Sequence, residues 1–154
     1  LCNPIHHIHL SGMMLDYPKL LDKGIGGLRS DLQEKLKEQP DNNFYKAGIQ
    51  CLDIFVDCAS HLQQDAREQM ASANMKRQKE LERICQALEN IKEKKPGTFH
   101  EAMQLFWLFA LLAGVINYGR LDDYLGPYLV ADLKSGAIDR RRGIPIYPLA
   151  LDHD

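Results

Sequence analysis

The chain has 154 residues, of which 45% are hydrophobic and 26% are charged, as in an ordinary globular domain that is long enough to bury a sizeable core. Its formal net charge of −2 argues against a nucleic-acid-binding surface and against binding to an anionic membrane. The longest apolar run, from Leu105 to Ile116, is shorter than the ~20 residues that cross a bilayer, so it predicts a buried helix and no membrane span.

The cysteines and the first residues of the sequence indicate the cellular compartment of the protein. Cys2, Cys51, Cys58 and Cys85 have no paired spacing typical of a metal site. Cys51 and Cys58 would lie about 10 Å apart on one helix, which excludes a disulfide between them. The sequence begins with Leu1 and no charged-then-apolar signal segment follows. The simplest interpretation is buried, reduced thiols in a cytoplasmic protein.

The first stretch of the chain is rich in histidine. His7 and His9 would share one face of an extended segment, with His6 on the other, and two histidines on one face can bind zinc or copper. No carboxylate or thiol stands at an adjacent ligand spacing. Polar or core histidines are therefore the favoured interpretation, and we expect no metal.

A helix with an interruption is predicted next. Asp16 is a suitable amino cap, and Pro18 falls in the first turn. Gly24, Gly26 and Gly27 then break the helical pattern and are expected to allow a close backbone approach or a positive φ. A second helical stretch follows them. It carries Leu28, Leu32 and Leu36 on one stripe and stops before Pro40.

Two long amphipathic helices are predicted after Pro40. Asp41, Asn42 or Asn43 can cap the first, and the second runs from about Lys76 to Lys94. The inward stripe of the first is Phe44, Gly48, Leu52, Phe55, Ala59, Leu62, Ala66 and Met70. The inward residues of the second are Leu81, Ile84, Cys85, Leu88 and Ile91, and its solvated face carries Lys79, Glu82, Arg83, Glu89 and Lys92.

The next helix is predicted to be the central one. Thr98 and Glu101 form a capping box, in which the Thr98 hydroxyl accepts from the Glu101 amide and the carboxylate reaches back. The body from Leu105 to Leu112 is apolar on every face, so we expect it to be covered all round, on one side by further protein if the parent is larger.

A polar turn follows this apolar helix and holds the candidate site residues. Asn117 and Tyr118 are the favoured cavity-facing side chains. Arg120 could bind a carboxylate or carbonyl group of a substrate, or it could form a structural ion pair with Asp122, Asp123 or a distant carboxylate. The structural role is the favoured one. The helical pattern ends after Gly136.

These motifs occur in an order that resembles a known family. Residues 12 to 133 are similar to the amino-terminal side of the pyruvate formate-lyase-type domain of glycyl radical enzymes. In the central part, the matching residues are Thr98, Phe99, Glu101, Ala102, Gln104, Trp107, Gly119, Arg120, Asp122, Tyr124, Leu125, Pro127 and Tyr128. Upstream they are Asp16, Tyr17, Leu20, Gly24 and Gly27, then Phe44, Tyr45, Ala47, Arg77, Glu80, Leu81 and Ile84.

The resemblance implies a mainly α chain, a helical bundle that forms part of a larger α/β-barrel. Residues 1–133 would be a partial domain and residues 134–154 a divergent or extended tail. The parent would be an anaerobic enzyme that cleaves C–C bonds or eliminates across C–O or C–N bonds of a small-molecule substrate. Its glycyl radical would be installed by a radical SAM activating enzyme. The partners of this chain would be the remainder of the parent, or a second copy through self-association.

The family pattern also shows what this sequence lacks. The family's catalytic cysteine loop and glycyl radical loop are absent, and Cys51-Leu52-Asp53 lies inside a helical pattern, so we expect no catalytic residue and no cofactor here. Diol-dehydrating relatives have Gly-His-Ser just before Gly-Arg, whereas residues 113–118 contain no His or Ser, which argues against a diol substrate. The alternative to a fragment or truncated member of such an enzyme is a non-catalytic helical module that associates through its apolar central helix.

Overall fold

The computed structural model describes residues 14–138, and in this range the chain forms five helices and one isolated β-bridge. The helices are α1 (Tyr17–Glu38), α2 (Asn43–Met70), α3 (Met75–Glu93), α4 (Phe99–Ala113) and α5 (Leu121–Ser135). The mainly α class predicted from the sequence is confirmed. The histidine stretch, Cys2 and most of the predicted tail lie outside the described residues.

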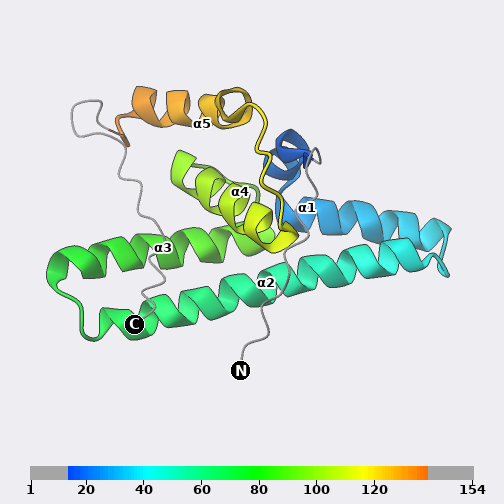
Figure 1. The fold of residues 1–154 in the computed structure, drawn as a ribbon, viewed down its shortest axis with the longest axis horizontal. Helices are drawn as coiled ribbons and strands as arrows, with labels where there is room; N and C mark the ends of the chain where they lie inside the picture. Colours follow the sequence, from blue (N-terminus) through cyan, green and yellow to red (C-terminus); the bar gives the residue numbers. More distant parts are fainter. Residues whose placement is uncertain (1–13, 139–154) are drawn as a thin grey trace.

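The longest helix, α2, organises the arrangement (Figure 1). The second part of α1 runs along one half of α2, and α3 runs back along the other half. Helix α4 lies across them and contacts each of the other four helices, while α5 covers α4 on the side away from α2. The prediction that the apolar helix is the central one is therefore confirmed.

Side chains cap the helices where the sequence predicts. Asp16 caps α1, Asn42 caps α2, and the Thr98 hydroxyl accepts from the Glu101 amide at 3.2 Å to cap α4. The second half of the capping box differs from the prediction. The Glu101 carboxylate accepts from the Gly97 amide at 2.7 Å, one residue before the cap. Each carboxylate oxygen of Glu101 is thus engaged, the other one by Asn90 of α3 at 2.7 Å.

The glycines in α1 provide both the positive φ and the close backbone approach that the sequence predicts. Gly24 has a positive φ of 66° and splits α1 into two parts that point in different directions. A Cβ on Gly24 would lie 2.7 Å from the Lys95 Cα, and a Cβ on Gly26 would lie 2.2 Å from the Glu93 carbonyl oxygen. The backbone of α1 therefore touches the backbone at the end of α3, which no side chain could permit.

The predicted inward faces are largely confirmed. All five inward residues of α3 are buried, as are Leu52, Phe55, Ala59 and Ala66 of the α2 stripe. The prediction that Phe44 is inside is wrong: it lies in the first turn of α2, at the end of the α1–α2 hairpin, and is 77% exposed. The expectation of buried thiols is wrong for Cys51, which is exposed, and holds for Cys85.

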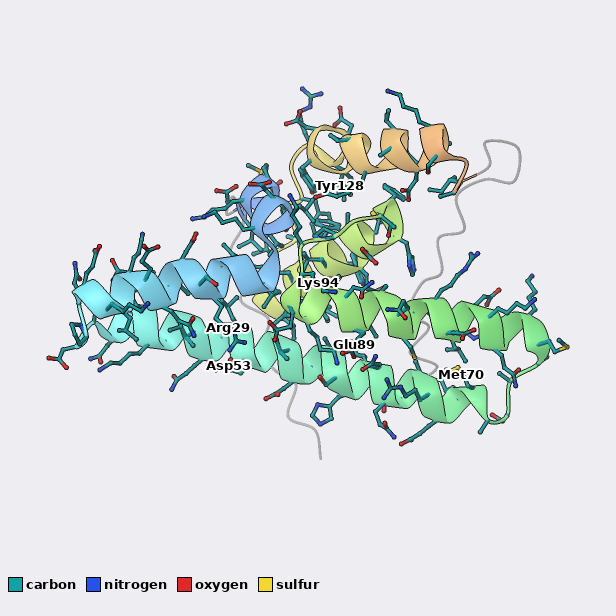
Figure 2. All side chains as sticks on the ribbon, turned by 180° about the vertical axis from the view of Figure 1, so that it is seen from behind. Arg29, Asp53, Met70, Glu89, Lys94 and Tyr128 are labelled. Atoms are coloured by element: carbon teal, nitrogen blue, oxygen red, sulfur yellow. The ribbon has the colours of Figure 1, made fainter. Side chains whose placement is uncertain are left out.

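One polar contact between α2 and α3 departs from the predicted pattern. Gln63, expected off the stripe, is only 5% exposed, and its amide donates to the Cys85 carbonyl oxygen at 2.9 Å. Its side-chain oxygen accepts from Lys92 Nζ at 3.0 Å, and Lys92 also pairs with Glu89 at 2.8 Å. Lys92 therefore bridges the two helices instead of lying on a solvated face. Its ion-pair partner Glu89 is labelled on α3 in Figure 2. An amphipathic side chain can fill this position because its stem packs while its charge is paired.

Helix α4 is covered on most, but not all, of its surface. Leu105, Phe106 and Leu108 are buried, whereas Trp107 is 44% exposed and Leu111 is 60% exposed. One side of α4 is therefore open among the described residues, and this is the kind of side that further protein is expected to cover if the parent is larger. No helix among residues 14–138 is both long and apolar enough to cross a membrane.

We predict that Gly26→Ala strongly destabilises the fold. The new methyl group would overlap the Glu93 carbonyl oxygen, and separating the two backbones should lower the free energy of unfolding by about 2 kcal/mol or more. Gly97→Ala is the matched control, because its Cβ would meet only the Glu101 carboxylate at an ordinary 3.6 Å. Urea unfolding followed by circular dichroism measures both, and equal stability of the two variants would contradict the close approach.

Candidate functional site

The candidate site is the segment that connects α4 to α5. Helix α4 ends at Gly114, which adopts the left-handed conformation with φ 64°, and Val115 then returns to the core at 4% exposure. Asn117 forms a parallel β-bridge with Met14. The segment is thereby fixed at both ends: by the helix cap and by pairing with residues that precede α1.

An aromatic cluster lies beneath this segment. Tyr17 of α1 stacks on Tyr124 of α5 with ring centroids 5.2 Å apart, and it meets Phe106 of α4 edge-on at 4.9 Å. Tyr118 of the segment contacts Phe106 at 5.5 Å and Trp107 at 6.2 Å. The cluster thus joins three helices to the segment.

A hydrogen bond fixes the backbone of the turn. The Tyr124 hydroxyl donates to the Tyr118 carbonyl oxygen at 2.6 Å. Burial raises the pKa of Tyr124 to about 12, and proximity to Tyr17 adds to the rise. Burial also raises the pKa of Tyr17. Both hydroxyls keep their protons at neutral pH, and the Tyr124 hydroxyl acts as a donor rather than a base.

Arg120 and Asp122 form the ion pair that was the favoured interpretation. Arg120 Nη2 lies 2.7 Å from Asp122 Oδ2, and the side chains are 79% and 72% exposed. The guanidinium hydrogen bond lowers the pKa of Asp122 and raises that of Arg120. The pair was expected because buried arginines are usually paired, but both side chains are exposed among the described residues. Solvent screens the pair, so it orients the turn more than it stabilises the fold.

The two predicted cavity-facing residues differ in their surroundings. Asn117 is exposed, and its side-chain oxygen accepts from the Gly119 amide at 3.2 Å, which closes a local turn. Tyr118 is half-buried against the aromatic cluster. The structure therefore brings Asn117, Tyr118, Arg120 and Asp122 together on one short turn. That they face a cavity in an assembled enzyme stays a prediction.

Three buried polar side chains were not singled out from the sequence. Asp132 of α5 is 8% exposed and accepts from the Phe99 amide at 2.9 Å, so it caps α4 from a neighbouring helix. The Tyr17 hydroxyl and Gln104 Nε2 are buried without a hydrogen-bond partner among the described residues. Buried polar atoms in native proteins nearly always have a hydrogen-bond partner, so a water molecule or further protein is expected beside these two atoms. The apolar periodicity of a helix does not predict that these polar side chains are buried, because their burial depends on how the helices pack against one another.

The uncovered side of α4 leads directly into the turn. It presents Trp107, Leu111 and Leu112, and Ile116 continues it at 56% exposure. An exposed apolar surface next to a polar turn is typical of a surface that packs on further protein.

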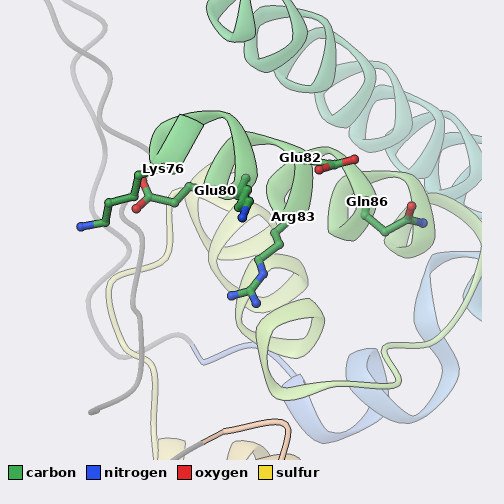
Figure 3. Close-up of a pocket in the computed structure, with 6 residues that line it drawn as sticks. Lys76, Glu80, Glu82, Arg83 and Gln86 are labelled. Atoms are coloured by element: carbon green, nitrogen blue, oxygen red, sulfur yellow. The ribbon is translucent and has the colours of Figure 1, made fainter. Parts of the chain in front are cut away.

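A groove of about 650 Å³ lies elsewhere, on the outer face of α3 (Figure 3). Its described lining comes from α3 alone: Lys76, Lys79, Glu80, Glu82, Arg83 and Gln86. Charges of both signs alternate along it, and Glu80 pairs with Arg77. This is a solvated charged face, as the sequence predicts for Lys79, Glu82 and Arg83, and not a converging site.

The described residues hold three cysteines and no cluster of metal ligands. No group of three or more metal-ligating side chains is found within 14–138, and His6, His7 and His9 fall outside that range. Cys51 is exposed and Cys58 is half-buried, whereas Cys85 is buried and donates to the Gln63 carbonyl oxygen at 3.6 Å. Burial raises the pKa of the Cys85 thiol, which does not favour a reactive thiolate there.

Comparison with known proteins identifies the family. The profile described as pyruvate formate lyase-like matches residues 6–144. A glycyl radical enzyme from Archaeoglobus fulgidus superposes with a TM-score of 0.76 at 26% identity, over 84% of this chain and 19% of that one. The chain belongs to the pyruvate formate-lyase-like glycyl radical enzyme family.

Alignments with curated members of the glycyl radical enzyme family also cover most of this chain but only a small part of each relative. (2S)-3-sulfopropanediol dehydratase of Klebsiella oxytoca is 30% identical in an alignment of 155 positions that covers 90% of this chain and 18% of that enzyme. Trans-4-hydroxy-L-proline dehydratase of Clostridioides difficile is 28% identical in an alignment of 140 positions that covers 78% of this chain and 17% of that enzyme. The chain spans about a fifth of the length of the relatives it matches.

The raised pKa of Tyr124 predicts a pH dependence of stability. An exposed tyrosine in the unfolded chain has a pKa of about 10, so the folded state holds this proton more tightly. The contribution of Tyr124 is complete below about pH 10 and is lost as the pH rises to about 12. Tyr124→Phe should therefore flatten the fall in unfolding free energy over this range.

At neutral pH, Tyr124→Phe should lower the free energy of unfolding by about 1 kcal/mol, because the Tyr118 carbonyl oxygen loses its hydrogen-bond donor. Urea unfolding at a series of pH values measures both effects. Part of the slope will remain in the variant, since the pKa of Tyr17 and that of Tyr128 are also raised. Parallel curves for wild type and variant would show that Tyr124 is not the titrating group.

Proposed function

We propose that this chain is a helical part of a longer glycyl radical dehydratase. The observation that carries the proposal is the uncovered apolar side of α4, which ends in the turn with Asn117, Tyr118 and the Arg120–Asp122 pair. In the larger protein this side would pack on further structure, and the turn would be brought to a cavity.

Dehydration is favoured over C–C cleavage by the relatives. Both curated relatives named above are dehydratases, and both names describe a small molecule that carries a hydroxyl and an acid group. The absence of His and Ser from residues 113–118 argues against a diol substrate. We therefore propose a small hydroxylated acid as the substrate and elimination of its hydroxyl group as water.

The residues of this chain have positioning roles in the proposal. Tyr124 holds the Tyr118 carbonyl oxygen and Phe106 packs on the Tyr118 ring, and Tyr118 with Asn117 would line one side of the substrate cavity. Arg120, held by Asp122, orients the turn and contributes positive charge beside it. The glycyl radical, installed by a radical SAM activating enzyme, supplies the one-electron chemistry from a part of the parent that this chain does not contain. The cytoplasm is the proposed compartment.

The first experiment is to purify the protein from its native host under anaerobic conditions and to measure its intact mass. We expect a mass several-fold above 17.6 kDa and, after activation, a glycyl radical signal in electron paramagnetic resonance. Hydroxylated sulfonates and carboxylates are then tested for loss of water. A mass near 17.6 kDa without any radical signal would refute the dehydratase proposal.

In that enzyme, Asn117→Ala should lower kcat/KM by ~10-fold or more, the loss expected when a substrate-positioning contact is removed. The radical signal per subunit should not change. Gln50→Ala, an exposed polar residue on α2, is the matched control and should have wild-type kinetics. If Asn117→Ala also has wild-type kinetics, Asn117 does not line the cavity.

A non-catalytic interaction module is the second candidate, and the same exposed side of α4 favours it. In this case the isolated chain should self-associate through Leu111, which is 60% exposed. Light scattering at high concentration compares Leu111→Lys with Ile54→Lys, which changes an equally exposed residue on α2. A wild-type chain that stays strictly monomeric would contradict this candidate.

A further inference from the structure

One side of α5 carries three polar groups, and each of them bonds to the main chain of a different segment. Tyr124, Tyr128 and Asp132 are spaced four residues apart, so they lie along the same side of the helix. The Tyr124 hydroxyl donates to the Tyr118 carbonyl oxygen of the turn at 2.6 Å. The Tyr128 hydroxyl donates to the Leu21 carbonyl oxygen of α1 at 3.1 Å (Figure 2). Asp132 accepts from the first amide of α4 at 2.9 Å.

Each of these main-chain groups lies where its own segment offers no regular partner. The first amides and the last carbonyls of a helix have no hydrogen-bond partner within that helix. Phe99 is the first residue of α4, and Leu21 lies shortly before the break in α1 at Gly24. Tyr118 is outside the helices. One side of α5 therefore supplies hydrogen-bond partners to three segments that are far apart in the sequence.

Helix α5 has few other features that hold it in place. Among its 15 residues, all of which the structure describes, only Tyr124, Leu125 and Asp132 are buried. Gly126 and Pro127 lie inside the helix, and both residue types disfavour a helical conformation. The position of α5 therefore depends on the three hydrogen bonds more than the position of a helix with a wide apolar face would.

The position of α5 in turn affects the position of the polar turn. Asp122 lies in the first turn of α5 and pairs with Arg120. Tyr124, one helical turn before Tyr128, holds the Tyr118 carbonyl oxygen. A shift of α5 along its axis would therefore move both of these contacts to the turn at once.

We propose that Tyr128 and Asp132 are positioning residues, which fix α5 so that the turn presents Asn117 to the substrate. Tyr128 sets α5 against α1, Asp132 sets it against α4, and neither touches the substrate. The inference rests on the proposed function, because the turn that these residues place is the candidate site. In the alternative, both residues stabilise the fold without deciding where the turn lies.

Hydrogen exchange in the complete parent enzyme tests the placement of the turn and needs no activity. The amides of Gly119 and Asp123 report on the turn, because they donate within it at 3.2 Å and 3.0 Å. Tyr128→Phe and Asp132→Ala should each speed the exchange of these two amides by ~10-fold or more. Asp132→Asn should restore slow exchange, because its amide oxygen can still accept from the first amide of α4.

Two control variants separate placement of the turn from a general loss of stability. Asn90→Ala removes the hydrogen bond to Glu101 at the same end of α4, but Asn90 belongs to α3, which is not packed against α5 among the described residues. Tyr45→Phe removes a hydroxyl group from α2, a helix that is likewise not packed against α5. Both controls should leave the exchange of the two turn amides within ~2-fold of wild type. Equal acceleration by Asn90→Ala and Asp132→Ala would overturn the inference, as would unchanged exchange in the two α5 variants.

Kinetics of the active enzyme test whether the placement of the turn matters to the substrate. Tyr128→Phe should lower kcat/KM by ~5-fold or more, mainly through a higher KM. In an Asn117→Ala background the same change should cost less than ~2-fold, because the contact that Tyr128 places is already gone. Fully additive losses would contradict the positioning role. An enzyme without a radical signal refutes only the proposed dehydratase, whereas unchanged exchange in an active enzyme refutes only the positioning role.

Discussion

The backbone contact between α1 and the end of α3 is the constraint on which the other features depend. Gly24 and Gly26 let α1 lie directly against Glu93 and Lys95, and the positive φ of Gly24 turns the first part of the helix away from α2. That turn carries Tyr17 under α4 and α5, where it is 1% exposed. Without the close approach, α1 could continue straight along α2, and no aromatic cluster would form beneath the candidate site.

The cluster in turn transmits this packing to the polar turn. Tyr17 stacks on Tyr124, whose hydroxyl holds the Tyr118 carbonyl oxygen, so the backbone of the turn is positioned by residues from both ends of the described chain. Asp132 adds a second tie by capping α4 from α5. The polar side chains of the turn can therefore be presented at a defined place although they are themselves exposed. Such support by buried neighbours is what a substrate-positioning element needs.

The apolar surface that the described helices leave uncovered is also informative. An apolar helix is stable when it is covered, yet Trp107 and Leu111 remain open, as does the parallel bridge next to them. These features lie along one continuous stretch of chain. The proposed neighbouring part of a longer enzyme would give them a common explanation, in line with the family and with the limited share of each relative that the chain spans.

The sequence by itself determined the helices, their caps and the family. Periodic apolar residues and capping side chains are local signals, which is why the caps Asp16 and Thr98 and the inward face of α3 could be predicted, and the cap of α2 could be narrowed to three adjacent residues. Only the tertiary structure decided which glycine is touched by which backbone, that Gln63 and Lys92 meet between helices, and that Phe44 stays outside. These outcomes depend on where helices distant in sequence cross, and no spacing within one helix encodes that crossing.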